Sequence, residues 1–263
     1  MRIVIKIGTS TLTHSTGRLN IKRTNEICQV ISDLKNEGHE IILVSSGAIA
    51  MGVGKLSLNE KPKDIPTKQA AAAVGQCELM YTYDRIFNSF NHTVAQMLIT
   101  KSDLDSVERH KNISNTLSRL LELNVLPVIN ENDTIATEEI KVGDNDTLSA
   151  YVATSAKADL LIILSDINGL YTADPRKDKN AKLIKKVEWV TEDIFALAGG
   201  VGTKLGTGGM ITKLKAAQIC NQEGCDMVIA NGQKVKLLYD IVNGKNGNYT
   251  RFFANKKLKE GGF

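Results

Sequence analysis

Short apolar runs alternate with longer stretches of helical periodicity along the chain. The runs expected to form strands lie at 3–7, 40–44, 94–99, 125–129, 160–164 and 227–230. Several are apolar at consecutive positions rather than alternate ones, which is typical of strands covered on both faces of a parallel sheet. Strand, helix and strand in repetition predict an α/β fold with right-handed crossovers.

The stretches between these runs repeat their apolar side chains with the period of a helix. In the first, 21–36, Ile27, Ile31 and Leu34 share one side, and Gly38 follows as a stop signal. Further helices are expected at about 68–87, 106–123, 147–156, 210–222 and 235–242. The remaining segments are interpreted as a loop at 49–58, a hairpin at 135–142 and an irregular insert at 183–190.

Length and composition favour one folded domain. The 263 residues are 42% hydrophobic and 24% charged, as in ordinary globular proteins. No Ser/Pro-rich linker and no internal repeat divides the sequence, so we expect a single domain over 1–263.

Charge and cysteine content exclude several classes of protein. The net charge is +4 and aromatic residues are 5%, which argues against a nucleic-acid partner. No apolar run is long enough to span a membrane, and the first strand starts without an export signal. The four cysteines form no C-x-x-C pair, which favours reduced thiols and a cytoplasmic protein. The scattered histidines make no metal pattern.

In an open parallel sheet, ligands bind at the carboxyl ends of the strands, and polar residues follow several of the expected strands. Lys6 and the turn that starts at Gly8 offer a positive charge and backbone amides, which suit a phosphate. Residues 45–52, which include Ser46, are mostly small and let a ligand approach the backbone, and the helix expected to follow would aim its first N–H groups at an anion. A plain capped turn would look the same. Residues 130–134 are polar, as in a surface turn or a substrate pocket.

Two further segments carry candidate chemistry. Asp144 and Asp146 flank Asn145 at a helix start, and this exceeds what one helix cap needs. These side chains could hold a lysine, Mg²⁺ through water, or an amine. Glycines at 206–209 precede a helix that carries Lys213, which is phosphate chemistry in outline. The P-loop and dinucleotide-binding fingerprints are absent, which disfavours an NAD-dependent oxidoreductase.

Together these segments resemble the amino acid kinase family and, within it, the glutamate 5-kinase branch. The residues that carry the resemblance are KIGTS at 6–10, VSSGAIA at 44–50, PVINEND at 127–133, KVGDND at 141–146, GLYTADP at 169–175 and GTGGM at 206–210. The NEND and KVGDND segments are specific to the glutamate kinases. The resemblance runs from about residue 2 to residue 254.

The resemblance implies a three-layer αβα sandwich on a central, mostly parallel sheet of about eight strands. It implies ATP-dependent phosphorylation of the γ-carboxylate of L-glutamate, the first step of proline biosynthesis, with Mg²⁺ on the nucleotide. The part at about 1–155 would bind glutamate, and the part at about 156–263 would bind ATP. An alternative within the fold is a kinase for another carboxylate or a phosphate acceptor. A non-catalytic sensor is disfavoured because Lys6, Asp146 and Lys213 are all present.

The resemblance also implies roles for individual residues. Lys6 and Lys213 would contact the transferring phosphoryl group, and Asp146 would orient both lysines. Glutamate would be bound by Ser46, Asp133 and Asn145. The ATP site would be lined by Lys6, Gly8, Ser165, Asp166, Thr207, Gly208, Gly209, Met210, Ile211, Thr212 and Lys213. Position 165 is more often Thr in the family, and Ser retains the hydroxyl.

Partners follow from the same resemblance. Proline is expected as a feedback inhibitor, glutamate-5-semialdehyde dehydrogenase as a functional partner, and a second copy of the chain in a homo-oligomer. Many glutamate 5-kinases continue into a small β-rich C-terminal domain. We expect this chain, which stops at Phe263, to be a form without it.

Overall fold

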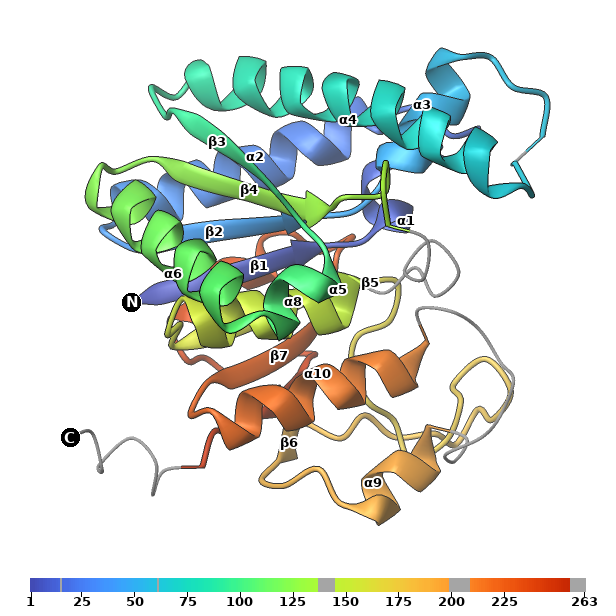
Figure 1. Ribbon diagram of the computed structural model, residues 1–263. Coiled ribbons are helices and arrows are strands. Elements are labelled where there is room, and N and C mark those ends of the chain that lie inside the picture. Colours follow the sequence, from blue (N-terminus) through green and yellow to red (C-terminus); the bar gives the residue numbers. More distant parts are fainter. Residues whose placement is uncertain (15, 61, 137–144, 199–208, 256–263) are drawn as a thin grey trace.

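A central sheet of eight strands, in the order β3-β4-β2-β1-β5-β7-β8-β6, runs through the molecule (Figure 1). The computed structural model describes all residues except 15, 61, 137–144, 199–208 and 256–263. The strands are β1 (Arg2–Ile7), β2 (Glu40–Ser45), β3 (Val94–Ile99), β4 (Leu126–Glu131), β5 (Leu160–Ser165), β6 (Lys186–Val187), β7 (Asp226–Asn231) and β8 (Thr250–Phe252). Every pairing is parallel except that of β7 with β8.

Helices cover both faces of this sheet. They are α1 (Thr9–Leu12), α2 (Ile21–Asn36), α3 (Ala48–Lys55), α4 (Ile65–Asn88), α5 (Lys101–Asp105), α6 (Val107–Glu122), α8 (Asn145–Ser155), α9 (Glu192–Leu197), α10 (Met210–Gln222) and α11 (Leu237–Val242). One core joins α2, α4 and α11 to inward residues such as Ile3 and Ile5 of β1. The other joins α6, α8 and α10 to Val4, which points to the opposite face. The three-layer αβα prediction is confirmed.

The expected strands are confirmed with ends shifted by at most two residues. The shift matters at β4, which starts at Leu126 and continues through Asn130 and Glu131. Both polar side chains are therefore buried in a strand and do not form the surface turn that the sequence allowed. Burial requires them to be hydrogen-bonded, which makes them candidates for a pocket wall.

Some helix ends were predicted correctly from local sequence patterns. The predicted helices 21–36 and 210–222 have the bounds of α2 and α10. Helix α4 begins before the predicted residue 68, at Ile65, because Asp64 caps it by accepting a 2.9 Å hydrogen bond from the backbone N–H of Thr67.

One interpretation of the connections is wrong. The predicted loop at 49–58 is mostly the helix α3, whose start is set by Gly47 at φ 104°. The insert at 183–190 is mostly irregular, as expected, and contributes only the two-residue strand β6, which pairs with β8. The predicted hairpin at 135–142 lies largely outside the described residues.

The topology brings the carboxyl ends of β4, β2, β1, β5 and β7 to one edge of the sheet. Strand β1 is central there: Lys6 is in register with Val44 of β2 and with Ile163 of β5. The first four strands occupy one half of the sheet and the last four the other half. A residue at the end of β1 is therefore adjacent to both halves.

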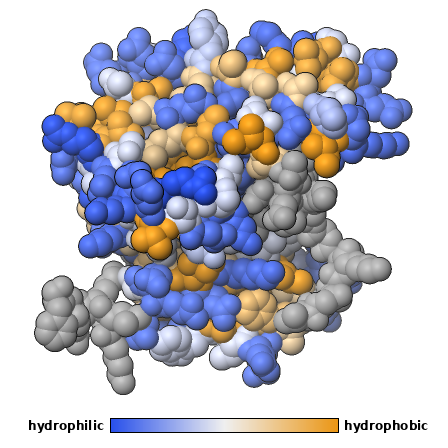
Figure 2. Space-filling view, viewed as in Figure 1, coloured by the Kyte–Doolittle hydropathy of each residue, from blue (hydrophilic) through white to orange (hydrophobic). Residues whose placement is uncertain are grey.

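Among the described residues, no helix combines the length and the apolar composition that crossing a membrane requires. The face seen in Figure 2 mixes hydrophilic and hydrophobic residues, with apolar patches over α3 and α4. Leu56 and Leu58, just after α3, are exposed.

Candidate active site

A carboxylate held between two lysines lies at the carboxyl end of β1. Asp146, the second residue of α8, is 2% exposed. Its Oδ1 lies 2.7 Å from Nζ of Lys6, and its Oδ2 lies 2.9 Å from Nζ of Lys213. The two lysines come from β1 and α10, and α8 packs against both elements (Figure 1). The fold thus joins three residues that are far apart in the sequence.

The electrostatics of this cluster keep a buried carboxylate ionised. Burial on its own would raise the pKa of the Asp146 carboxyl, but the ammonium groups of Lys6 and Lys213 outweigh it and hold that pKa below its usual value. Asp146 is therefore ionised at neutral pH. One negative charge lies between two positive charges, and both lysines are themselves buried.

The start of α10 supports the same carboxylate. The hydroxyl of Thr212 lies 2.9 Å from Oδ2 of Asp146 and 2.8 Å from the carbonyl oxygen of Gly209, so it can donate to either. Gly209 is the N-cap of α10, and none of the described side chains caps that end. Backbone amides of a helix start attract phosphate. Met210 and Ile211 occupy this first turn and are half-buried.

A second cluster surrounds Asn145, the neighbour of Asp146. Its Nδ2 lies 3.0 Å from the carbonyl oxygen of Ser45 and 3.0 Å from Oγ of Ser46. The same Nδ2 lies 2.9 Å from Oδ1 of Asn130. The structure thus brings Ser46 and Asn145 together, as the resemblance implied.

This cluster continues to a residue that sequence reasoning missed. The amide of Asn130 donates a 2.9 Å hydrogen bond to Oε1 of Gln76, in the middle of α4. Asn130 and Gln76 are buried. A polar residue at the end of β4 was a visible signal, since residues 130–134 were noted as polar. Nothing in the sequence around Gln76 indicated a site residue, because it follows an alanine-rich stretch of a helix with no polar motif.

The segment that carries Ser46 is held by close helix packing. A Cβ atom added to Gly75 of α4 would lie 1.8 Å from the carbonyl oxygen of Ala48, at the start of α3. Only a glycine allows this approach. The contact fixes α3, and with it the turn at Gly47 that follows Ser46.

The remaining predicted residues that the structure describes lie at the same ends of the strands. A Cβ atom on Gly8 would lie 3.6 Å from Nζ of Lys6, so the Gly8 backbone borders that ammonium group. Ser165 ends β5, and its hydroxyl donates to Oδ1 of Asp166 at 3.1 Å. Asp133 is half-buried in the turn after β4. Thr207 and Gly208 lie outside the described residues.

No group of three His, Cys, Asp or Glu side chains in the described part of the chain could hold a metal ion. A Mg²⁺ ion carried by nucleotide phosphates fits such a site, because Mg²⁺ keeps several waters and needs one or two protein carboxylates at most. Asp166, exposed after β5, is a carboxylate on the side where the nucleotide is expected.

The profile of the amino acid kinase family matches residues 1–231. The glutamate 5-kinase of Clostridium acetobutylicum is 55% identical over 93% of this chain and 92% of its own length. That of Clostridium tetani is 54% identical over 93% and 91%. That of Caldanaerobacter subterraneus is 54% identical over 93% of this chain, which is 66% of the relative.

Solved structures agree on the fold. Carbamate kinase from Giardia lamblia bound to AMP-PNP superposes with a TM-score of 0.68 at 18% identity, over 97% of this chain and 98% of that one. UMP kinase from Ureaplasma parvum gives 0.63 at 17% identity, over 96% and 98%. The architecture shows the fold, and the family profile and the curated relatives show the rest: this chain belongs to the amino acid kinase family and, within it, to the glutamate 5-kinases.

Proposed function

We infer that this chain transfers the γ-phosphoryl group of ATP to the γ-carboxylate of L-glutamate and forms L-glutamyl 5-phosphate, the first step of proline biosynthesis. The observation that carries this inference is the Lys6–Asp146–Lys213 cluster, in a chain whose relatives are named glutamate 5-kinases.

The chemistry of the site suits this reaction. Both reactants are anions, so catalysis depends on neutralising charge and on in-line placement. A γ-carboxylate is already ionised at neutral pH and needs no general base. Two buried lysines with one shared carboxylate provide positive charge that an incoming phosphoryl group can bind. Mg²⁺ on the nucleotide would add further neutralisation of the phosphate charge.

We assign the residues as follows. Lys6 and Lys213 contact the transferring phosphoryl group, Lys213 from the nucleotide side, and Asp146 orients both ammonium groups. Ser46, Asp133 and Asn145 bind glutamate. The nucleotide is bound by Gly8, Ser165, Asp166 and residues 207–213, of which Gly209 to Lys213 are described. On this assignment residues 1–155 hold the acceptor and residues 156–263 hold the donor.

Further partners are proposed on the same basis. Proline would compete with glutamate, because it shares the α-carboxylate and the α-nitrogen but lacks the reacting γ-carboxylate. The acyl phosphate product is reactive, which favours coupling to a glutamate-5-semialdehyde dehydrogenase. Assembly as a homo-oligomer and a cytoplasmic location complete the proposal.

The test is to trap the acyl phosphate. The purified chain is incubated with ATP, Mg²⁺ and hydroxylamine, with glutamate, aspartate, carbamate or UMP as the acceptor. Hydroxamate reports an acyl phosphate, and ADP release reports phosphoryl transfer to any of the acceptors. We expect hydroxamate with glutamate only, and ADP release that requires glutamate. Turnover with another acceptor, or none with glutamate, would reject the assignment. Asp146→Asn serves as the inactive control.

A further inference from the structure

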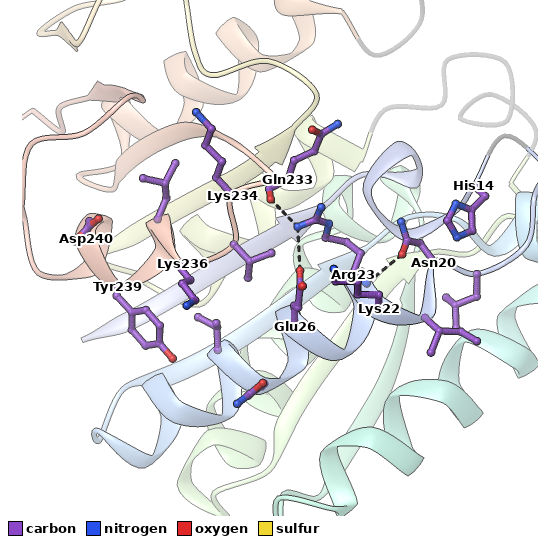
Figure 3. Close-up of a pocket in the computed structure, with 16 residues that line it drawn as sticks. His14, Asn20, Lys22, Arg23, Glu26, Gln233, Lys234, Lys236, Tyr239 and Asp240 are labelled. Carbon is purple, nitrogen blue, oxygen red and sulfur yellow. Dashed lines mark hydrogen bonds and ion pairs between the residues drawn. The ribbon is translucent and has the colours of Figure 1, made fainter.

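A cavity separate from the active site lies between α2 and the segment that leads from β7 into α11 (Figure 3). Its volume is about 950 Å³, within the range of sites for small ligands. Its lining residues come from 14, 19–30 and 233–240, and they include none of the described residues assigned to the active site. Helices α2 and α11 also pack on the face of the sheet opposite α8 and α10.

The cavity has an apolar floor and charged side chains around it. Leu19, Val30, Val235 and Leu237 form much of the apolar lining. Figure 3 shows Arg23 and Glu26 on one wall, and Gln233, Lys234 and Lys236 on the other. A site of this kind suits a molecule with both a nonpolar part and charged groups.

The acidic groups of the lining are already paired. Glu26 Oε2 lies 3.0 Å from Nη1 of Arg23. Asp240 Oδ1 lies 3.7 Å from Nζ of Lys245. Their negative charges are therefore compensated by partners within the chain.

Three lysines of the lining are not paired in this way. Within the described part of the chain, the ammonium groups of Lys22, Lys234 and Lys236 have no ion-pair partner. All three side chains are exposed and line the same cavity from two walls. Positive charge concentrated around a concave, partly apolar surface attracts anions.

The walls are held together before any ligand arrives. Nη1 of Arg23 donates a 2.6 Å hydrogen bond to the carbonyl oxygen of Gln233, which joins α2 to the opposite wall (Figure 3). The hydroxyl of Tyr239 donates to Oδ2 of Asp33 at 2.7 Å, which joins α11 to α2. A preformed cavity loses little conformational entropy when it binds a ligand.

We propose that this cavity binds a small anion with two or three carboxylate or phosphate groups on a partly apolar body. Lys22 binds it from α2, and Lys234 and Lys236 bind it from the β7–α11 segment. The apolar floor contacts the body of the ligand. Carboxylates and phosphates share the chemistry that ammonium groups recognise, so the experiment separates them.

The test uses calorimetric titration with two probes, benzene-1,3,5-tricarboxylate and inorganic pyrophosphate. Three proteins are compared: the unmodified chain, the cavity variant K22Q/K234Q/K236Q, and a control variant with three exposed lysines replaced elsewhere, K111Q/K157Q/K186Q. Both variants lose the same charge, so general electrostatic attraction changes equally. Thermal unfolding checks that both remain folded.

We expect at least one probe to bind the unmodified chain and the control variant with similar affinity, and the cavity variant at least tenfold more weakly. The probe that binds more tightly identifies the carboxylate or the phosphate class. Absence of binding to the unmodified chain would overturn the proposal. Equal affinity in all three proteins would locate the anion at the active-site lysines and would overturn it as well. If both variants bound the probe equally weakly, the loss of affinity would come from net charge alone, and the proposal would again be overturned.

Discussion

Asn130 at the end of β4 donates its side-chain amide to Gln76 in α4 across 2.9 Å, and both residues are buried. The other end of the Asn130 side chain, Oδ1, faces the amide of Asn145. Gln76 therefore acts on the proposed glutamate site through Asn130 and is a positioning residue.

Replacing Gln76 by Leu removes the acceptor for the Asn130 amide. A buried amide without a partner costs about 1–3 kcal/mol, and it can rotate away from Asn145. We expect the KM for glutamate to rise about tenfold while the KM for ATP stays unchanged. Gln76→Glu, which keeps an acceptor oxygen, should restore much of the affinity. Thr82→Val, a buried polar change in the same helix, is the control. Equal changes in both KM values would indicate general damage to the fold.

Removing either lysine of the cluster should slow phosphoryl transfer itself. We expect Lys6→Ala and Lys213→Ala each to lower kcat by roughly 10²-fold or more, the scale of one lost preorganised contact to a developing charge. Lys6→Arg should not restore full activity, because a planar guanidinium does not superpose on a compact ammonium. Lys215→Ala, exposed on the same helix as Lys213, is the matched control. A change in KM alone would make the lysine a ground-state binding group.

Asp146→Asn should abolish most turnover and also weaken the fold. The substitution leaves two buried lysines without their shared carboxylate, a change that costs about 3–5 kcal/mol. Urea unfolding at pH 7 measures this loss, and Asp84→Asn on the surface of α4 is the control. An unchanged free energy of unfolding would show that water already reaches the lysines.

The difference in stability between the wild type and Asp146→Asn should depend on pH. Burial alone would raise the pKa of Asp146, but Lys6 and Lys213 outweigh it and lower that pKa in the folded state. Its contribution to stability is thus complete above its unfolded pKa of about 3.9 and is lost as the pH falls through the lower folded value. The difference in unfolding free energy between the wild type and Asp146→Asn should be constant from pH 7 to about pH 5 and should shrink below pH 4. A difference that grows on acidification would contradict the charge pairing.

Gly75→Ala should disturb the proposed glutamate site from a distance. The new methyl group would meet the carbonyl oxygen of Ala48 at 1.8 Å, so α3 and α4 must separate. Overpacking of this kind costs typically about 1–3 kcal/mol. We expect a lower melting temperature and a raised KM for glutamate, because α3 carries the turn after Ser46. Ala73→Ser, at an exposed position of α4, should change neither the melting temperature nor the KM for glutamate.

Proline should inhibit competitively with glutamate. Initial rates measured against glutamate at several proline concentrations should give lines that meet at one maximal velocity. Asn145→Ala should weaken the apparent affinities for glutamate and proline together if Asn145 contacts the α-carboxylate or the α-nitrogen, which both molecules carry. Inhibition that saturating glutamate cannot relieve would place proline elsewhere.

Particular residues show how far the sequence predicts this molecule. The apolar runs predict six strands because burial on both faces leaves a continuous pattern. Strands β6 and β8 escape prediction because Lys186–Val187 and Thr250–Phe252 are too short to show a period, and they form only by pairing with each other and with β7. Helix α3 was interpreted as a loop, and its Gly52 shows what the local pattern could not: a Cβ atom there would lie 1.8 Å from the carbonyl oxygen of Ala71 in α4, so the glycine is required by helix packing.

Some residues of the candidate site could be predicted from the sequence, and others are brought together only by the tertiary fold. The rule for strand ends places Lys6, Ser46 and Ser165 at one edge of the sheet. Lys213 lies on a helix, so its approach to Asp146 is a property of the tertiary fold that only the family resemblance suggested. Thr212 was expected near ATP, and its contact with Asp146 was not foreseen. The partnership of Gln76 and Asn130 depends on how α4 crosses β4, which no local pattern encodes.

Strand β1 joins the two halves of the sheet through backbone pairing, with Lys6 in register with Val44 on one side and Ile163 on the other. Many kinases open and close by swinging one lobe against the other about a hinge. Here such a swing would break the β1–β5 ladder. On the proposed assignment, the donor and acceptor sites therefore lie on one continuous sheet whose two halves share the backbone pairing of β1. On that assignment, the spacing between the two sites depends on the register of β1 with β2 and β5.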